Sequence, residues 1–522
     1  MKKLFALLLA LMLVVPAFAM AENFPIVDEP ITLTAFATAG PYTKGNFNDL
    51  AMWKAMEQLT NVKIDFNAAP SGQSAEPLGL LFASNTLPDV IFKTGLSNSD
   101  IAKYAEEGQL LPIDAYLEEY APNFYGLMEE MPAIRNAITQ ANGHIYGFPY
   151  LVTCSSSNVV GKPFINAAFL QSIDAEMPAT TDDLKELLVA FKESDWNGNG
   201  EADEIPMTCE GLETLITSLY GTFGLGTKGC VDIAWDIDPE TGDLRYTPTS
   251  EGYYNLLAFL NELYTEGLFD EEIFDSSIAK VQAKSDQNQL FYCPATNSMY
   301  FTAYEKDFVG LEAPLTYNGS EPFWAGQNLA IAGQNTFFTS SCTEEELIAA
   351  IQYFDYFYCD EGRTLFFMGI ENETFYYDEA GLPQFTDYVK ANPDGMGMEE
   401  ALGTYVCWSG GGNPSVADDL HFGNHLISAA TMKAAQNMIN YGPDEIWGSF
   451  TYTTEESERI AELATDINDY IKTSRAAFIT GSTPLNEETW ATYVAKIAEM
   501  GIDEYMGIQE TAYQRYLDVI GE

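Results

Sequence analysis

Between residues 31 and 92 the chain alternates strand-like and helix-like segments, which constrains the fold more than any other feature. ITLTAFATAG, residues 31–40, is rich in β-branched residues and predicts a strand. MWKAMEQLT predicts a helix that leads into a strand near 62–66. A second helix must end before Pro88, because proline lacks an amide donor and restricts the residue before it, and a strand follows at 89–92. This order predicts an α/β fold with a largely parallel sheet.

A second block of elements begins near residue 161. KPFINAAFLQSI, residues 162–173, suggests a helix. In PATTDDLKELLVAFKESD, Thr180 and Asp183 have the spacing of a capping box. The apolar residues that follow at helical spacing are Leu184, Leu187, Leu188 and Phe191.

Three further helical patterns complete the chain. Residues 255–269 form an amphipathic pattern closed by Gly267, and 345–362 form another that stops at Gly362. The region from Glu455 to the C-terminus is mostly helical in pattern. A chain of 522 residues with 47% hydrophobic and 19% charged residues is globular and exceeds the size of one core, so we expect two or more lobes.

The N-terminus has the pattern of a secretory signal peptide, residues 1–21. Lys2 and Lys3 precede an apolar run, and the small-residue pattern AMA precedes Glu22. The run is shorter than the roughly 20 residues that span a bilayer, and no later stretch is long enough, so we expect no membrane insertion. The net charge of −53 argues against nucleic acid or anionic membranes as partners, because both require a basic surface.

Seven cysteines are too few for a disulfide scaffold and show no CxxC spacing. Their odd number leaves at least one thiol free or available for an intermolecular bond, and the sequence leaves any pairing open. For each of them a buried, small apolar role is favoured over that of a nucleophile.

The segment DWNGNGEADEIP, residues 195–206, carries oxygen side chains at the spacing of a calcium loop. With Asp195 as position 1, Gly200 falls at position 6, where a tight turn is needed, and Glu201 at position 7, where a backbone carbonyl serves. The side-chain oxygens at positions 1, 3, 5 and 9 belong to Asp195, Asn197, Asn199 and Asp203. This pattern predicts a structural calcium ion.

The end of the same loop departs from an EF-hand. Pro206 stands where a bidentate glutamate is expected, and a strand rather than a helix is predicted to follow. Glu204 is close enough to replace the missing carboxylate. The alternative is a solvated turn rich in Asn and Gly, in a chain that has 77 acidic residues.

Several segments, in order along nearly the whole mature chain, resemble one family. The resemblance is to the extracellular solute-binding proteins of family one, in the long branch that includes the alginate-oligosaccharide-binding proteins and related lipoproteins. The segments are ASNTLPDVIF, EEGQLLPIDAYL, NGHIYGFPY, PATTDDLKELLVAFKESD with NGNG and DEIP, LYTEGLFDEEIF, RAAFITGS and AYQRY.

The resemblance implies a two-lobe α/β fold of the periplasmic-binding-protein type II, with a helical C-terminal region. It also implies a monomer that holds an oligosaccharide between its lobes and delivers it to an ABC permease, without catalytic residues. The six calcium ligands are then Asp195, Asn197, Asn199, Glu201, Asp203 and Glu204. We expect crossings near 150–165, 305–340 and 400–430. The expected division is 22–160 in lobe 1, 161–310 in lobe 2, 311–410 mainly in lobe 1 and 411–522 mainly in lobe 2.

Sugar sites stack aromatic rings on the apolar faces of sugars. Trp408 in YVCWSGGGNP is the first candidate, because a large ring beside a glycine run is poorly placed for a helix core; Trp324 and Tyr150 follow. His421 and His425 have the spacing of two metal ligands on one helical turn, but no zinc-protease pattern accompanies them. The negative field favours neutral oligosaccharides over uronates.

One departure from the family concerns the site of signal cleavage. Related lipoproteins are anchored through a lipidated cysteine there, whereas this chain has Met20, Ala21 and Glu22. We therefore expect a periplasmic protein, or one that is secreted or held at the cell surface by other means. Two other functions stay open: a secreted glycoside hydrolase, which needs two carboxyl groups facing each other across a cleft, and a calcium-stabilised surface protein.

Overall fold

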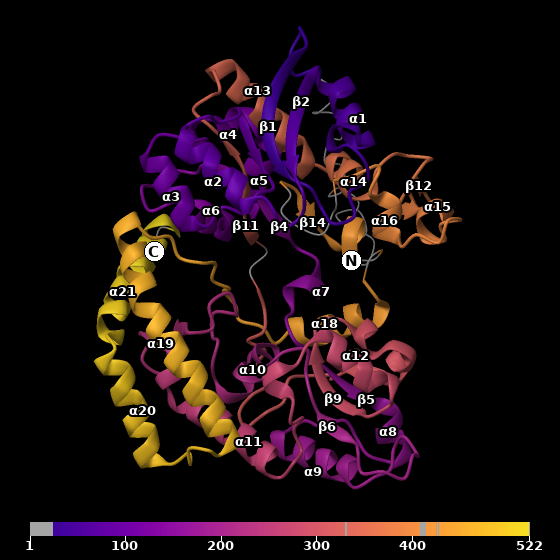
Figure 1. The fold of residues 1–522 in the computed structure, drawn as a ribbon, viewed down its shortest axis with the longest axis vertical. Helices are drawn as coiled ribbons and strands as arrows, with labels where there is room; N and C mark the ends of the chain where they lie inside the picture. Colours follow the sequence, from indigo (N-terminus) through magenta and orange to yellow (C-terminus); the bar gives the residue numbers. More distant parts are fainter. Residues whose placement is uncertain (1–23, 329–330, 408–413, 424, 426, 521–522) are drawn as a thin grey trace, which may run out of the picture.

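The computed structural model describes residues 24–328, 331–407, 414–423, 425 and 427–520. The expected signal peptide and Trp408 lie outside these residues. Figure 1 shows two α/β lobes, one above the other, with the C-terminal helices along one side. We call the part built on the six-stranded sheet the first lobe and the part built on the four-stranded sheet the second lobe.

The first lobe contains the predicted alternation of strands and helices. Its sheet has the order β14-β4-β11-β3-β1-β2. Strand β1 pairs in parallel with β2 and with β3, whereas β11 runs antiparallel to β3 and β4, so the sheet is mixed. The strands are β1 (Ile31–Thr38), β2 (Val62–Ala69), β3 (Val90–Phe92), β4 (Gly147–Val152), β11 (Ile331–Phe338) and β14 (Val416–Ala417).

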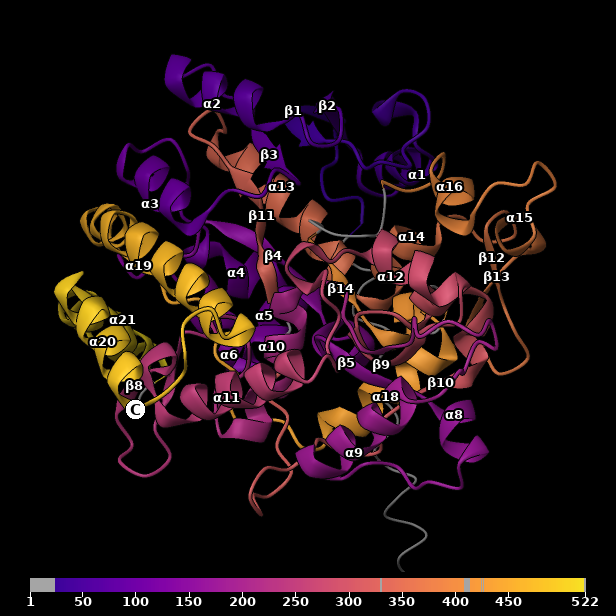
Figure 2. The same cartoon turned by 60° about the horizontal axis from the view of Figure 1, so that its bottom comes forward.

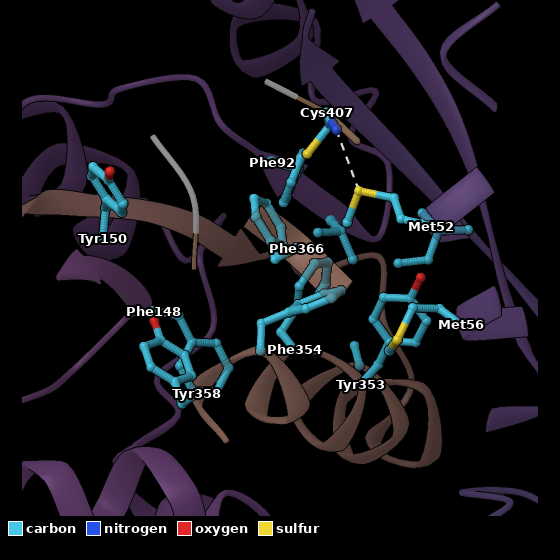
Figure 3. Packing of buried hydrophobic residues seen from close by; sticks show 14 of the residues in the cluster. Met52, Met56, Phe92, Phe148, Tyr150, Tyr353, Phe354, Tyr358, Phe366 and Cys407 are labelled. Carbon is cyan, nitrogen blue, oxygen red and sulfur yellow. Dashed lines mark hydrogen bonds between the residues drawn. The ribbon is translucent and has the colours of Figure 1, made fainter. Parts of the chain in front are cut away.

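Helices cover both faces of this sheet (Figure 1). They are α1 (Ala51–Thr60), α2 (Ala75–Ser84), α3 (Asn98–Glu106), α4 (Asp114–Tyr120), α5 (Pro122–Glu130), α6 (Pro132–Ile138), α13 (Glu344–Asp355), α14 (Asp360–Met368), α15 (Asp387–Lys390) and α16 (Met398–Leu402). A short hairpin, β12 (Phe375–Tyr377) and β13 (Pro383–Phe385), extends from the same lobe. Figure 3 shows the core between sheet and helices, where Phe92, Phe354 and Phe366 meet Met52 and Met56.

The predicted single helix over 345–362 is wrong. Helix α13 ends at Asp355, a 3-10 turn follows, and α14 starts at Asp360, so Gly362 lies inside a helix instead of ending one. A Cβ on Gly362 would lie 1.8 Å from the carbonyl oxygen of Tyr356. The glycine is therefore needed for the close contact between the turn and the new helix, which the apolar periodicity did not reveal.

The second lobe has a four-stranded sheet in the order β10-β5-β9-β6. Strands β6 and β9 are parallel and the other pairs antiparallel. The strands are β5 (Lys162–Asn166), β6 (Ile205–Met207), β9 (Leu290–Ala295) and β10 (Phe308–Gly310). The helices are α8 (Ala167–Ser172), α9 (Thr181–Lys192), α10 (Leu212–Tyr220), α11 (Glu251–Thr265), α12 (Ile278–Asp286) and α18 (Ala429–Ile439), with a hairpin of β7 (Trp235–Ile237) and β8 (Leu244–Tyr246).

Two sequence predictions in this lobe have different outcomes. The capping box of Thr180 and Asp183 is present at the start of α9. The helix predicted over 162–173 is correct only in its second half, because 162–166 is strand β5. All five residues of β5 are buried between β9 and β10, and partner strands that are distant in sequence decide their conformation.

The predicted helical C-terminal region consists of α19 (Thr454–Thr480), α20 (Glu487–Glu499) and α21 (Ile502–Ile520). Figure 2 shows the three helices side by side. Helix α19 packs on α11 of the second lobe and also reaches the first lobe, where the Thr454 hydroxyl donates to the Glu106 carboxylate at 3.2 Å. Among the described helices, none combines the length and apolar character needed to cross a bilayer.

Three segments connect the lobes. The first contains α7 (Ser155–Asn158), the second joins Gly326 to β11, and the third contains the π-helical turn Asp419–Gly423 between β14 and α18. Leu311, Leu315 and Trp324 pack in the core of the second lobe. The return to the first lobe therefore occurs after Ala325, later in the chain than the boundary expected at 311.

Candidate ligand cleft and calcium loop

The segment from Asp195 to Glu204 forms a closed loop between α9 and β6. Two of its glycines, Gly198 and Gly200, have positive φ angles of 72° and 80°, which residues with a Cβ rarely adopt. The Gly198 amide donates to the Asp195 carbonyl at 3.2 Å. The glycines thus let the chain fold back over the side chain of Asp195.

The side chains of the loop turn inward onto its own backbone. Both carboxylate oxygens of Asp195 lie 3.2 Å from the Gly200 amide. The side-chain oxygen of Asn197 accepts from the Asn199 amide at 3.1 Å, and that of Asn199 accepts from the Glu201 amide at 2.7 Å. These three oxygen-bearing side chains are therefore held on the inner side of one turn.

Asp203 closes the loop from its far end. Its carboxylate accepts hydrogen bonds from the side-chain amides of Asn197 and Asn199, each at 3.0 Å, and from Gln289, just before β9, at 2.6 Å. Burial acts to raise the pKa of Asp203, but these hydrogen bonds outweigh it and hold the pKa below its usual range. Asp203 is thus stabilised as a carboxylate, the form that binds a cation.

Glu204 has one oxygen that no described group satisfies. Its Oε1 accepts from the Trp196 amide at 2.9 Å, whereas Oε2 is buried without a hydrogen-bond partner in the described part of the chain. A buried carboxylate oxygen without a partner costs about 1–3 kcal/mol or more. A cation bound at this position would remove that cost.

The loop thus brings five of the six predicted ligands together: Asp195, Asn197, Asn199, Asp203 and Glu204. Glu201 is exposed, and its role in the prediction rests on its backbone carbonyl. Among the described residues, no three His, Cys, Asp or Glu side chains converge in a way that would hold a metal. At this loop the acidic side chains do not converge because Asp203 faces amide donors. Asparagine and carbonyl oxygens supply much of the predicted ligand set.

A groove in the first lobe follows the carboxyl ends of β1 and β2. It has a volume of about 550 Å³, and Phe47 and Phe66 contribute aromatic rings to its lining. The chain segments that line it are 39–47, after β1, and 66–71, at the end of β2. In α/β folds, ligands bind beyond the carboxyl ends of the strands, so this groove is a candidate part of a binding cleft.

Lys93, directly after β3, was not singled out from the sequence. Its side chain is 7% exposed, and its Nζ donates to the Cys407 carbonyl at 2.8 Å. Burial lowers the pKa of Lys93 to about 8. This hydrogen bond holds Cys407, the residue before Trp408, at the carboxyl end of β3. The groove along β1 and β2 lies at the same edge of the sheet. No local sequence pattern marks this lysine, and its positive φ of 57° is known only from the backbone.

The second lobe has polar side chains at the corresponding ends of β6 and β9. Glu210 accepts hydrogen bonds from the amide and the hydroxyl of Thr296, and its other oxygen is buried without a partner in the described part of the chain. Lys162, fully buried, donates to the Val159 and Thr296 carbonyls at 2.8 Å each. Burial lowers its pKa to about 8, and the charge of Glu210 opposes this shift. Sequence analysis missed these residues because they are far apart in the chain.

The aromatic candidates predicted from the sequence do not lie together. Trp324 is 2% exposed within the core of the second lobe, and its amide donates to the Tyr441 carbonyl at 2.8 Å. Tyr150 is 6% exposed in the first lobe, and Figure 3 shows it apart from the rings of Phe148 and Tyr358. Trp408 lies outside the described residues. Trp53 and Trp490 pack in the cores, as their helical patterns indicate.

Two adjacent aspartates in the third crossing, Asp418 and Asp419, hold the crossing segments: one bonds within its own crossing and the other bonds to the first crossing. Asp419 accepts from the Ser155 amide at 3.2 Å, which links the first and third crossings. Asp418 contacts the His421 ring at 3.0 Å from Nδ1, and His421 is 3% exposed. The ring of His425 packs against Phe385 instead, at a centroid distance of 5.3 Å. The two histidines therefore have separate structural contacts.

Comparison with known proteins places the chain beside solute-binding proteins. The family model described as bacterial extracellular solute-binding protein matches residues 40–271. The chain is 26% identical over 515 residues to the fructooligosaccharide ABC transporter substrate-binding protein FusA of Streptococcus pneumoniae, a match that covers 95% of this chain and 92% of FusA.

Solved structures share the fold along nearly the whole chain. A FusA EF-hand mutant of S. pneumoniae in complex with fructo-nystose has 23% identity and a TM-score of 0.70, and the match covers 94% of this chain and 100% of that chain. The alginate-binding protein AlgQ2 without calcium ion has 19% identity and a TM-score of 0.67, covering 94% and 99%.

Proposed function

We propose that the chain is an extracellular solute-binding protein, which captures an oligosaccharide between its lobes for delivery to the permease of an ABC importer. The observation that carries this function is the match to FusA over 95% of the chain, together with the same two-lobe fold.

The proposed ligand site lies between the carboxyl ends of the strands of the two lobes. In the first lobe the groove along β1 and β2 and the contact of Lys93 with Cys407 support it, because that contact holds Cys407, the residue before Trp408, at this edge of the sheet. We propose that Trp408 stacks on a sugar ring. Trp324 and Tyr150 each pack in the core of one lobe in this structure, so neither supports a sugar contact as Trp408 does.

Closure of the lobes follows from the position of the ligand. A sugar that contacts both lobes does so fully only when they approach, so its binding energy shifts the population toward a closed form. The crossing segments held by Asp419 and Ser155 are where such a movement would be concentrated.

The experiment that tests this function is titration calorimetry of the mature chain with kestose and nystose, the short fructans suggested by FusA, beside an alginate oligosaccharide of similar length. We expect one-to-one binding of a neutral oligosaccharide, and chromatography of the sugar after incubation should show no products. Hydrolysis of the sugar by the purified chain would favour the glycoside hydrolase, and the failure of a broad glycan array to bind would leave the calcium-stabilised surface protein.

We further propose that the loop 195–204 binds a structural calcium ion. The residues that would hold it are Asp195, Asn197, Asn199, Asp203 and Glu204, with the carbonyl of Glu201. The unpartnered oxygen of Glu204 and the lowered pKa of Asp203 support a cation here. The EF-hand of FusA and the calcium ion of AlgQ2 are features of those proteins and agree with this proposal. Calorimetry of the calcium-free chain with calcium tests it directly, and magnesium serves as the comparison.

The remaining proposals concern the cellular setting. We propose that the mature chain begins near Glu22, acts as a monomer outside the cytoplasmic membrane, and is either periplasmic or at the cell surface without a lipidated cysteine at the cleavage site. Mass spectrometry of the mature protein from its own cell tests the N-terminus and any lipid. Gel filtration with light scattering tests the monomer.

A further inference from the structure

A partly open cavity of about 210 Å³ lies beneath the C-terminal helices, apart from the strand ends of the two lobes. The segment 447–452, which leads into α19, contributes Trp447, Phe450 and Tyr452 to its wall. Trp235 of β7 and Tyr505 of α21 contribute two more rings. Its described lining shares no residue with the groove along β1 and β2 or with the strand ends of the second lobe described above, so the cavity is separate from the proposed sugar cleft.

Four of the rings form two contacting pairs in the wall of the cavity. Trp235 and Tyr505 meet edge to face with centroids 5.0 Å apart, and Trp447 and Phe450 are 5.1 Å apart. Four of the five rings are more than nine-tenths buried, namely Trp235, Trp447, Phe450 and Tyr505. The Nε1 of Trp447 is buried and has no hydrogen-bond partner in the described part of the chain. The ring face of Trp447 already attracts a cation, since the Lys228 ammonium lies 5.7 Å from its centroid.

Asp232 is the acidic group of the cavity wall. Its carboxylate accepts one hydrogen bond, from the Ala234 amide at 3.1 Å, and forms no ion pair with a described basic residue. The residue is exposed to water, yet burial raises the pKa of its carboxyl group. Both observations agree when the carboxyl group faces a concave space that is open to water on one side and surrounded by protein on the others. Burial is the main cause that raises the pKa of Tyr246, Tyr452 and Tyr505, and the negative charge of Asp232 adds to each of these shifts.

The basic residue among the described lining is Lys228, and its charge is already neutralised. Its ammonium pairs with the Glu445 carboxylate at 2.5 Å, and Glu445 is held in turn by the Tyr516 hydroxyl at 3.0 Å. The cavity therefore combines aromatic faces with one carboxylate that lacks a cation. Aromatic faces attract cations, most strongly when the site is desolvated.

We propose that this cavity is a second binding site, for a small organic ammonium ion whose charge lies beside Asp232 and whose alkyl groups contact the aromatic rings. A cavity of about 150 Å³ holds benzene, so the space here accommodates a guest of similar or slightly larger size. Hard metal ions prefer six or more oxygen ligands, whereas this wall offers one carboxylate and mostly carbon. A neutral guest of the same shape would leave the carboxylate without a counter-charge.

Calorimetry of the mature chain with choline chloride tests the site, with 3,3-dimethylbutan-1-ol as an uncharged molecule of nearly the same shape. We expect choline to bind and the neutral alcohol to bind at least about tenfold more weakly. Equal affinity for both would overturn the proposal in favour of a simple apolar cavity. The absence of any heat from choline at millimolar concentration would also overturn it.

Variants distinguish the effect of the Asp232 carboxylate on choline binding from the effect of the protein's overall negative charge. Asp232→Asn keeps the shape and should weaken choline binding at least about tenfold, whereas Glu240→Gln, at the tip of the β7–β8 hairpin, removes the same charge and should leave it unchanged. Tyr452→Leu should weaken choline binding by removing a half-buried ring, and this variant tests the site if Asp232→Asn does not fold. Unchanged choline affinity in Asp232→Asn or Tyr452→Leu would contradict the site. Oligosaccharide affinity should be the same in Asp232→Asn as in the parent, which keeps this test independent of the proposed sugar cleft.

Discussion

The ammonium of Lys93 donates a hydrogen bond of 2.8 Å to the carbonyl of Cys407, a residue 314 positions later in the chain. The bond joins the end of β3 to the segment that leads to Trp408, within the core shown in Figure 3, where the Cys407 amide also donates to the Met52 sulfur at 3.3 Å. Lys93 is buried, and charging it inside the protein costs free energy.

Lys93 should therefore give the stability of the protein a specific pH dependence. Its pKa is about 8 in the folded chain and near 10.5 when exposed, so between these values the unfolded chain holds a proton that the folded chain has released. Stability attributable to Lys93 then rises with pH across this window. Relative to Lys93→Met, the parent should gain about 2 kcal/mol in free energy of unfolding between about pH 7.5 and about pH 9.5. Urea unfolding of both proteins measures it, and a constant difference would contradict the burial argument.

Trp408→Ala should weaken oligosaccharide binding at least about tenfold. Aromatic contact is worth about 0.5–1.5 kcal/mol beyond the area it buries, and about 1.4 kcal/mol corresponds to a factor of ten in affinity. Calorimetry with the sugar found in the glycan screen measures the change. Trp490→Ala is the matched control, since this ring packs on Tyr254 and Phe478 away from the strand ends, and it should lower stability while affinity is retained. Equal affinity in Trp408→Ala and the parent would leave Trp408 without a role in the site.

Removal of calcium should lower the melting temperature of the protein, and adding calcium back should return the melting temperature to its original value. A ligand that binds only the folded state adds about 2.7 kcal/mol at a hundredfold excess over its Kd. Asp195→Ala should abolish the difference between chelator and calcium because it removes a primary oxygen ligand. Asp182→Ala, which removes an exposed aspartate from the first turn of the preceding helix, should retain it. Identical melts of the parent in chelator and in calcium would favour the solvated turn.

Glu204→Gln should change stability in opposite directions with and without calcium. In chelator the parent buries a carboxylate oxygen that has no partner, so the neutral amide should raise the melting temperature slightly. In calcium the variant lacks one anionic ligand, and its Kd for calcium should rise. Scanning calorimetry in both conditions tests this, and a shift of the same sign in both would mean that Glu204 is not a ligand.

Gly362→Ala should be strongly destabilising, by several kcal/mol, because the added Cβ would lie 1.8 Å from the Tyr356 carbonyl oxygen. Gly79→Ala is its control: it also lies inside a helix, and a Cβ there meets no atom within 4 Å. The control should be neutral or stabilising by up to about 1 kcal/mol, since alanine favours helix. Denaturant unfolding compares the two, and similar stabilities would contradict the packing at the α13–α14 turn.

The sequence by itself determined the features that depend on neighbouring residues. The capping box of Thr180 and Asp183, the turn glycines Gly198 and Gly200, and the alternation from β1 to β3 each arise from interactions within a few positions, so a local pattern is enough to predict them. The calcium ligands could be predicted in the same way, because one loop supplies all of them.

Only the tertiary structure decided the features that depend on distant partners. Residues 162–166 have helical character in isolation but become a strand because β9 and β10 pair with them. Trp324 stands two positions before a glycine in the sequence, yet the core of the second lobe encloses it. The contact of Lys93 with Cys407, and the carboxylate of Asp232 among rings from β7, the 447–452 segment and α21, join residues hundreds of positions apart. Burial and pairing of this kind are properties of the packed chain, and no periodicity within a segment encodes them.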